Sequence, residues 1–85
     1  MTRISHIPLV TKAMTKQIAH RLQELKGTRS QNQWAKELGI PQQNLHRYFR
    51  GSPPHANFLV HVGRREGVNL NWLLLGEGEM FRAEV

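Results

Sequence analysis

Amide, imidazole and guanidinium side chains crowd one short stretch of the chain, namely Gln42, Gln43, Asn44, His46 and Arg47. A helical projection of this stretch puts Leu45, Tyr48 and Phe49 on one apolar face and leaves the polar side chains outside that face. Asn and Gln can each form two hydrogen bonds with adenine, and Arg can do so with guanine. No carboxylate stands among these groups, whereas a helix face that only meets water normally mixes acids with bases. The pattern favours a base-reading face over an ordinary solvated one.

The segment around this stretch contains the elements that would position it. Residues 31–51 have the pattern of two short helices joined by a glycine turn, with the second helix from about residue 41 to 50. Ala35, Gly39 and Leu45 have the small–turn–apolar spacing of a DNA-binding helix-turn-helix. Alanine allows close helix approach, glycine can adopt the left-handed backbone that ends a helix, and leucine anchors the second helix. Such a unit places its second helix in the major groove of DNA.

Apolar periodicity predicts three more helices, over about residues 13–26, 55–66 and 70–75. The expected fold class is therefore all-α, with five helices around one core and the helix-turn-helix at the second and third. Ser30 and Gln33 match a capping box that would start the second helix. The expected organisation is an N-terminal arm, a helix-turn-helix domain, and a tail or start of a linker, at residues 1–12, 13–76 and 77–85.

Charge and length fit one small nucleic-acid-binding domain. The chain has 85 residues and a formal net charge of +6. Residues 1–50 carry nine Lys/Arg and two Glu, a balance of +7, while residues 51–85 carry three Arg and four Glu, a balance of −1. The positive field therefore lies in the half with the reading stretch, as phosphate binding requires. No apolar run approaches the ~20 residues of a membrane helix, and no secretory signal is apparent.

Other kinds of site have weaker support. The chain has no cysteine, and its histidines lack HxxxH pairing, so no metal site is expected. It also has no aspartate, and its three serines are explained as arm, cap and turn residues, so we expect neither catalysis nor a cofactor. Aromatic side chains could stack on single-stranded nucleic acid. Their helical spacing favours core packing instead. The aromatic residues expected in the core are Trp34, Tyr48, Phe49, Phe58 and Trp72.

The C-terminal part carries more large apolar side chains than one small core requires. Some should close the core, and the remainder could form a self-associating patch. The residues of this expected dimer patch are Leu74, Leu75, Met80 and Phe81.

Two stretches resemble the XRE-type helix-turn-helix family, and more narrowly the N-terminal domains of lambda-like temperate-phage immunity repressors. They are QNQWAKELGIPQQNLHRYFRG, residues 31–51, and FLVHVGRREGVNLNWLLLGEGEMF, residues 58–81. The resemblance covers residues from about 14 to 81 and implies a five-helix, lambda-repressor-like fold. It also implies a repressor that binds an inverted-repeat operator in double-stranded DNA as a homodimer, in the cytoplasm of the bacterial host. An antitoxin-type autorepressor, an activator, and a protein-interaction module without DNA binding stay open as alternatives.

The resemblance also implies roles for single residues. Gln31 would bond a phosphate and brace Gln42, while the outer side chains of the reading helix would contact base edges. The predicted phosphate contacts are Gln31, Arg50, Ser52, Arg29 and Lys36. The chain departs from the family pattern at Pro53, where lambda-type repressors often have asparagine, and at Trp34, which is larger than the usual aliphatic residue.

Overall fold

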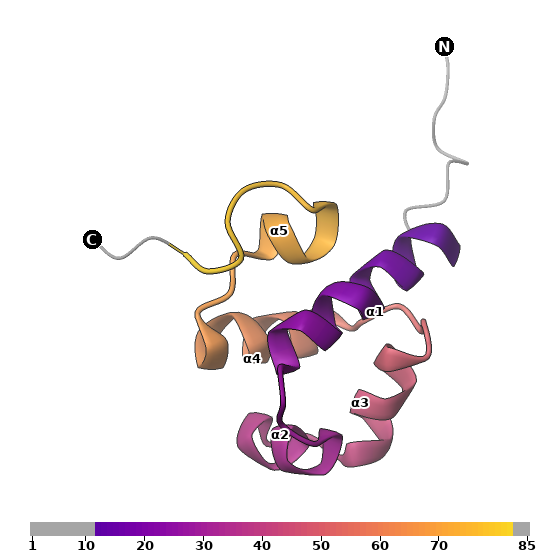
Figure 1. The fold of residues 1–85 in the computed structure, drawn as a ribbon. Coiled ribbons are helices and arrows are strands. Elements are labelled where there is room, and N and C mark those ends of the chain that lie inside the picture. The colour runs from indigo at the N-terminus through magenta and orange to yellow at the C-terminus, as the bar shows by residue number, and fades with distance from the viewer. Residues whose placement is uncertain (1–11, 83–85) are drawn as a thin grey trace.

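The computed structural model describes residues 12–82, with side chains from residue 14 onward, and contains five α-helices (Figure 1). The helices are α1 Lys12–Lys26, α2 Gln31–Leu38, α3 Gln42–Phe49, α4 Ala56–Glu66 and α5 Leu70–Leu75. The predicted all-α class and the order of the five helices are confirmed. None of these helices is long and apolar enough to span a bilayer. The expected N-terminal arm lies almost wholly outside the described residues.

The ends of α2 and α3 follow local signals in the sequence. Ser30 Oγ accepts a hydrogen bond from the Gln33 backbone N–H at 3.0 Å, but the Gln33 side chain donates to Glu37 instead of returning to Ser30. Half of the predicted capping box therefore forms. Gly39 ends α2 with φ 73°, in the left-handed region as predicted. Pro41 has an extended backbone, with ψ 140°, and is the N-cap of α3, so the helix starts one residue later than expected.

One core joins the helices, and most of the aromatic side chains belong to it. The buried hydrophobic residues are Ile18, Leu22, Leu25, Trp34, Ala35, Leu38, Leu45, Tyr48, Phe58, Val62, Val68 and Leu73. The ring centroids of Trp34 and Phe49 are 6.0 Å apart, and those of Tyr48 and Phe58 are 4.4 Å apart. Trp72 is partly buried against the same core. Core packing of the aromatic residues, rather than stacking on nucleic acid, is confirmed.

Residues 77–82 fold back onto the domain instead of leaving it as a tail. This segment, which we call the closing loop, passes over α5 and returns to the junction between α4 and α5 (Figure 1). The Asn69 N–H donates to the Met80 carbonyl at 2.8 Å, and the Arg82 N–H donates to the Gly67 carbonyl at 2.9 Å. An isolated antiparallel bridge pairs Val68 with Phe81. The tail expected from residue 77 is thus tied to the domain through residue 82.

Gly76 lets Arg21 of α1 hold the end of α5. Arg21 Nη1 donates to the Leu73 carbonyl at 3.0 Å, and a Cβ at Gly76 would lie 2.7 Å from Arg21 Nη2. Gly76 also has φ 78°. Gly76→Ala should therefore lower the free energy of unfolding by roughly 1–2 kcal/mol from backbone strain, with a further loss from the displaced guanidinium. Urea unfolding followed by circular dichroism measures the change.

Gly27→Ala is the matched control for the Gly76 substitution. Gly27 has φ 65°, and a Cβ there would meet no atom within 4 Å. It therefore reports backbone strain alone. Equal losses of unfolding free energy in the two variants would contradict the claim that Gly76 leaves room for the Arg21 side chain.

Candidate nucleic-acid interface

The polar side of α3 is open to solvent because the opposite side of the helix is committed to the core. Leu45 and Tyr48 are buried, and Phe49 packs partly against the core. The outward side chains line an open surface depression of about 500 Å³, which we call the reading face. It is lined by Gln42, Gln43, Asn44, His46 and Arg47. The structure thus brings together all five predicted base-reading residues, with Asn44 half-buried and the others exposed.

Hydrogen bonds organise three side chains of the reading face. Arg47 Nη2 donates to Asn44 Oδ1 at 2.8 Å, so the amide orients a guanidinium that has further N–H donors to offer. His46 Nδ1 lies 3.3 Å from Gln31 Oε1, at the start of α2, within hydrogen-bond distance. The family resemblance implied that Gln31 braces Gln42. The structure instead pairs Gln31 with His46.

Four of the five predicted phosphate contacts lie on α2 or follow the end of α3. Gln31 stands at the start of α2, and Lys36 is exposed on the same helix. Arg50 follows α3 and is exposed. Ser52 is half-buried and lines a depression of about 360 Å³ between the end of α3 and the start of α4, together with Arg47. These four residues offer amide, ammonium, guanidinium and hydroxyl donors at the borders of α3 and on α2.

Arg29 is the exception, since its guanidinium group bonds within the domain. Its Nη1 lies 2.8 Å from Glu37 Oε1, and its Nη2 lies 3.0 Å from Glu66 Oε1. Its Nε donates to the Lys26 carbonyl at 3.0 Å, and its Cζ lies 5.2 Å from the centre of the Trp34 ring. The hydrogen bond to Glu66 raises the pKa of Arg29, and the one from Arg29 lowers the pKa of Glu37. With two carboxylates against its charge, Arg29 is removed from the phosphate set.

Glu66 is the central acceptor of this ion-pair network, and sequence reasoning missed it. Its Oε2 accepts from Trp34 Nε1 at 3.0 Å and from Arg29 Nη1 at 3.2 Å. The indole is fully buried, so its N–H needs a partner inside the protein. Glu66, at the end of α4, supplies that partner, so the larger residue at position 34 is accommodated with its N–H bonded. The network ties α2 to α4, and the buried indole N–H is the signal that could have revealed it.

Comparison with known families identifies the type of domain. The model of the bacteriophage CI repressor helix-turn-helix domain matches residues 17–81. The chain belongs to this family. The match to the CI repressor helix-turn-helix domain runs from α1 through the closing loop, so it includes the segment that sequence analysis assigned to a tail. Comparison with curated proteins and with solved structures gave no match. As a CI repressor helix-turn-helix domain, it is a DNA-binding domain of a transcription regulator.

Proposed function

We propose that this domain is a repressor module that binds a specific operator in double-stranded DNA by inserting α3 into the major groove. The reading face carries the proposal, because four of its five side chains are exposed and none is acidic. If this side of α3 only met water, carboxylates would be expected among its exposed side chains. Occupation of the operator would then block transcription by steric exclusion.

Base recognition is assigned to the outward side chains of α3. Gln42 and Gln43 precede the others along the helix and can bond adenine, while Arg47 can bond guanine. Asn44 orients Arg47 through the 2.8 Å hydrogen bond and can also reach a base edge. His46 acts as a groove-facing donor that is steadied by α2.

Backbone contacts are assigned to the remaining polar residues around α3. Arg50 and Lys36 would supply salt-dependent attraction, because each phosphate they neutralise releases counterions. Gln31 and Ser52 would supply neutral hydrogen bonds that fix the register of the domain on the duplex.

A homodimer on DNA is part of the proposal. Leu75 and Phe81 are 55% and 53% exposed, so both offer apolar surface to a second copy of the domain. Leu74 and Met80 pack partly against the core beside them in sequence, so they contribute less free surface. Association through α5 and the closing loop would place two reading helices about 34 Å apart, in successive major grooves of an inverted repeat.

Selection of bound sites from a random duplex library tests the function directly. The expected result is an enriched inverted repeat whose half-sites lie about one helical turn apart. A control variant with Gln42, Gln43 and Arg47 all replaced by alanine should stay folded, since these side chains are exposed, and should enrich no site. If the unaltered domain enriches no sequence over the control, the proposed function is wrong.

A further inference from the structure

A second depression lies between the end of α3 and α1. Of the residues that line it, the proposed function assigns a role only to Arg50. This α1-side cleft has a volume of about 360 Å³. Its lining residues come from α1 and from the end of α3, and they are Lys16, Ala19, His20, Gln23, Phe49, Arg50 and Gly51. The polar members are an ammonium, an imidazole, an amide and a guanidinium, so none is a carboxylate. All four polar side chains are exposed.

The course of the backbone explains why Lys16 of α1 and Arg50 after α3 line the same cleft. Lys16 and His20 are four residues apart, so they share one face of α1. Gly51 has φ 104°, and a Cβ there would lie 4.0 Å from Thr15 Oγ1 of α1. The chain therefore leaves α3 against α1, which brings Arg50 beside the exposed face of that helix.

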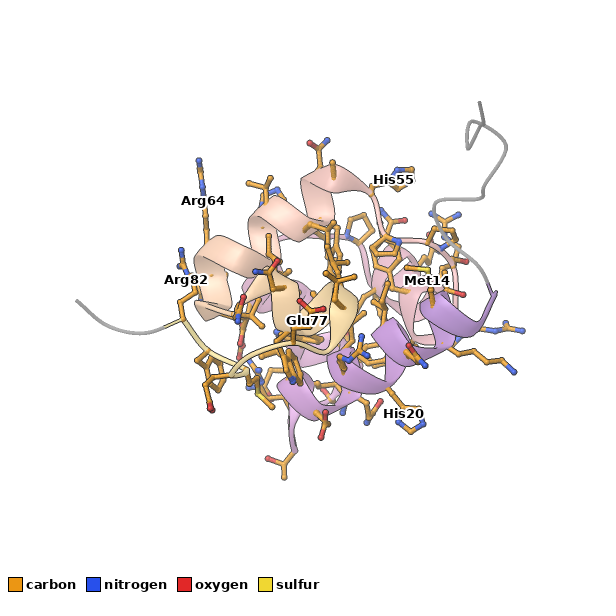
Figure 2. The ribbon with its side chains drawn as sticks, turned by 90° about the horizontal axis from the view of Figure 1, so that it is seen from above. Met14, His20, His55, Arg64, Glu77 and Arg82 are labelled. Atoms are coloured by element: carbon orange, nitrogen blue, oxygen red, sulfur yellow. The ribbon has the colours of Figure 1, made fainter. Side chains whose placement is uncertain are left out.

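The α1-side cleft adjoins one edge of the reading face. Arg50 stands four residues after His46, so these two side chains lie on one side of the helix. The depression at the start of α4, lined by Ser52 and His55, adjoins the other edge. Figure 2 shows His20 and His55 projecting from opposite sides of the domain.

The size of a helix relates these two depressions to the two DNA strands. An α-helix with its side chains is about 10–12 Å across, and the major groove is about 12 Å wide. A helix in the groove therefore has one phosphate backbone along each of its edges. A donor-rich cleft beside the reading face lies where one of these backbones must pass.

We propose that the α1-side cleft holds a phosphodiester of the strand that borders the major groove on the α1 side. Lys16 and Arg50 contribute the charge, and His20 and Gln23 contribute hydrogen-bond donors beside it. The proposal rests on the proposed DNA-binding function and extends the interface to α1, where sequence analysis assigned no contact.

Substitution of Lys16 tests the cleft, with duplexes taken from the site selection. Lys16→Gln should weaken binding to selected and random duplex by the same factor, roughly tenfold at low salt, and Lys16→Glu should weaken it further. The slope of log affinity against log salt should become shallower by about 0.9 for Lys16→Gln. Arg64→Gln is the control, because Arg64 is exposed on α4 and projects from the side opposite His20 (Figure 2). It should leave affinity within twofold.

Duplexes with a single neutral methylphosphonate locate the contact. At one backbone position the neutral linkage should remove the difference in affinity between the unaltered domain and Lys16→Gln. Thermal unfolding should show the same midpoint for all variants, because the substituted side chains are exposed.

The outcomes separate the cleft from the function on which it rests. If the unaltered domain binds the selected duplex and Lys16→Glu binds it equally well, the cleft holds no phosphate and the proposed function stands. Equal losses for Lys16→Gln and Arg64→Gln would show a general charge effect and overturn the cleft, as would a loss confined to one sequence. If the unaltered domain binds no duplex, the proposed function itself fails.

Discussion

Glu66→Ala is expected to lower the free energy of unfolding by about 2–4 kcal/mol. Glu66 accepts hydrogen bonds from Trp34 Nε1 and from both terminal nitrogens of Arg29, at 3.0 to 3.2 Å. Alanine would leave a fully buried indole N–H without an acceptor. It would also leave the guanidinium with Glu37 as its remaining carboxylate partner.

Urea unfolding at neutral pH measures this effect against two other variants. Glu66→Gln keeps an oxygen that can accept from the indole but loses the charge, so its loss should be intermediate. Glu77→Ala removes an exposed carboxylate of the closing loop and should change stability by less than about 0.5 kcal/mol. A Glu66→Ala variant no less stable than Glu77→Ala would refute a structural role for the ion-pair network.

Arg47→Ala should relax the sequence preference of DNA binding at one or two base pairs, by about 1–3 kcal/mol of discrimination. The reason is its place on the reading face, where Asn44 Oδ1 holds its guanidinium. Arg50→Ala should instead weaken binding to all duplexes similarly and make the salt dependence shallower by about one unit of slope. Arg50 differs because it follows the helix and lines the α1-side cleft.

The two arginine variants are distinguished by one set of titrations. Affinities are measured on the selected site, on its single base-pair variants and on random duplex, each at several salt concentrations. The Arg47 variant should lose affinity mainly on the selected site, so that its profile over the base-pair variants becomes flatter. Equal losses by both variants on specific and random DNA would contradict this division of roles.

Sequence alone determined the features that depend on neighbours along the chain. The order of five helices, the stop at Gly39 and the polar outer side of α3 all follow from periodicity and turn chemistry within a few residues. The N-cap at Ser30 and the burial of Leu45 are local in the same sense. A helix of eight residues with a clear apolar side can present its other side only to the outside, so the reading face was already implied.

Tertiary structure alone decided the contacts between residues far apart in the chain. Arg29 resembles any other basic residue in sequence, and only the return of α4 puts Glu66, 37 residues later, beside it. The pairing of Val68 with Phe81 is likewise non-local, which is why the closing loop could be mistaken for a tail. The packing of α1 against the end of α3 makes a cleft from Lys16 and Arg50, whose charges are visible in the sequence and whose proximity is not. Charge and periodicity are properties of segments, whereas an ion pair or a binding cleft requires two segments to meet in space.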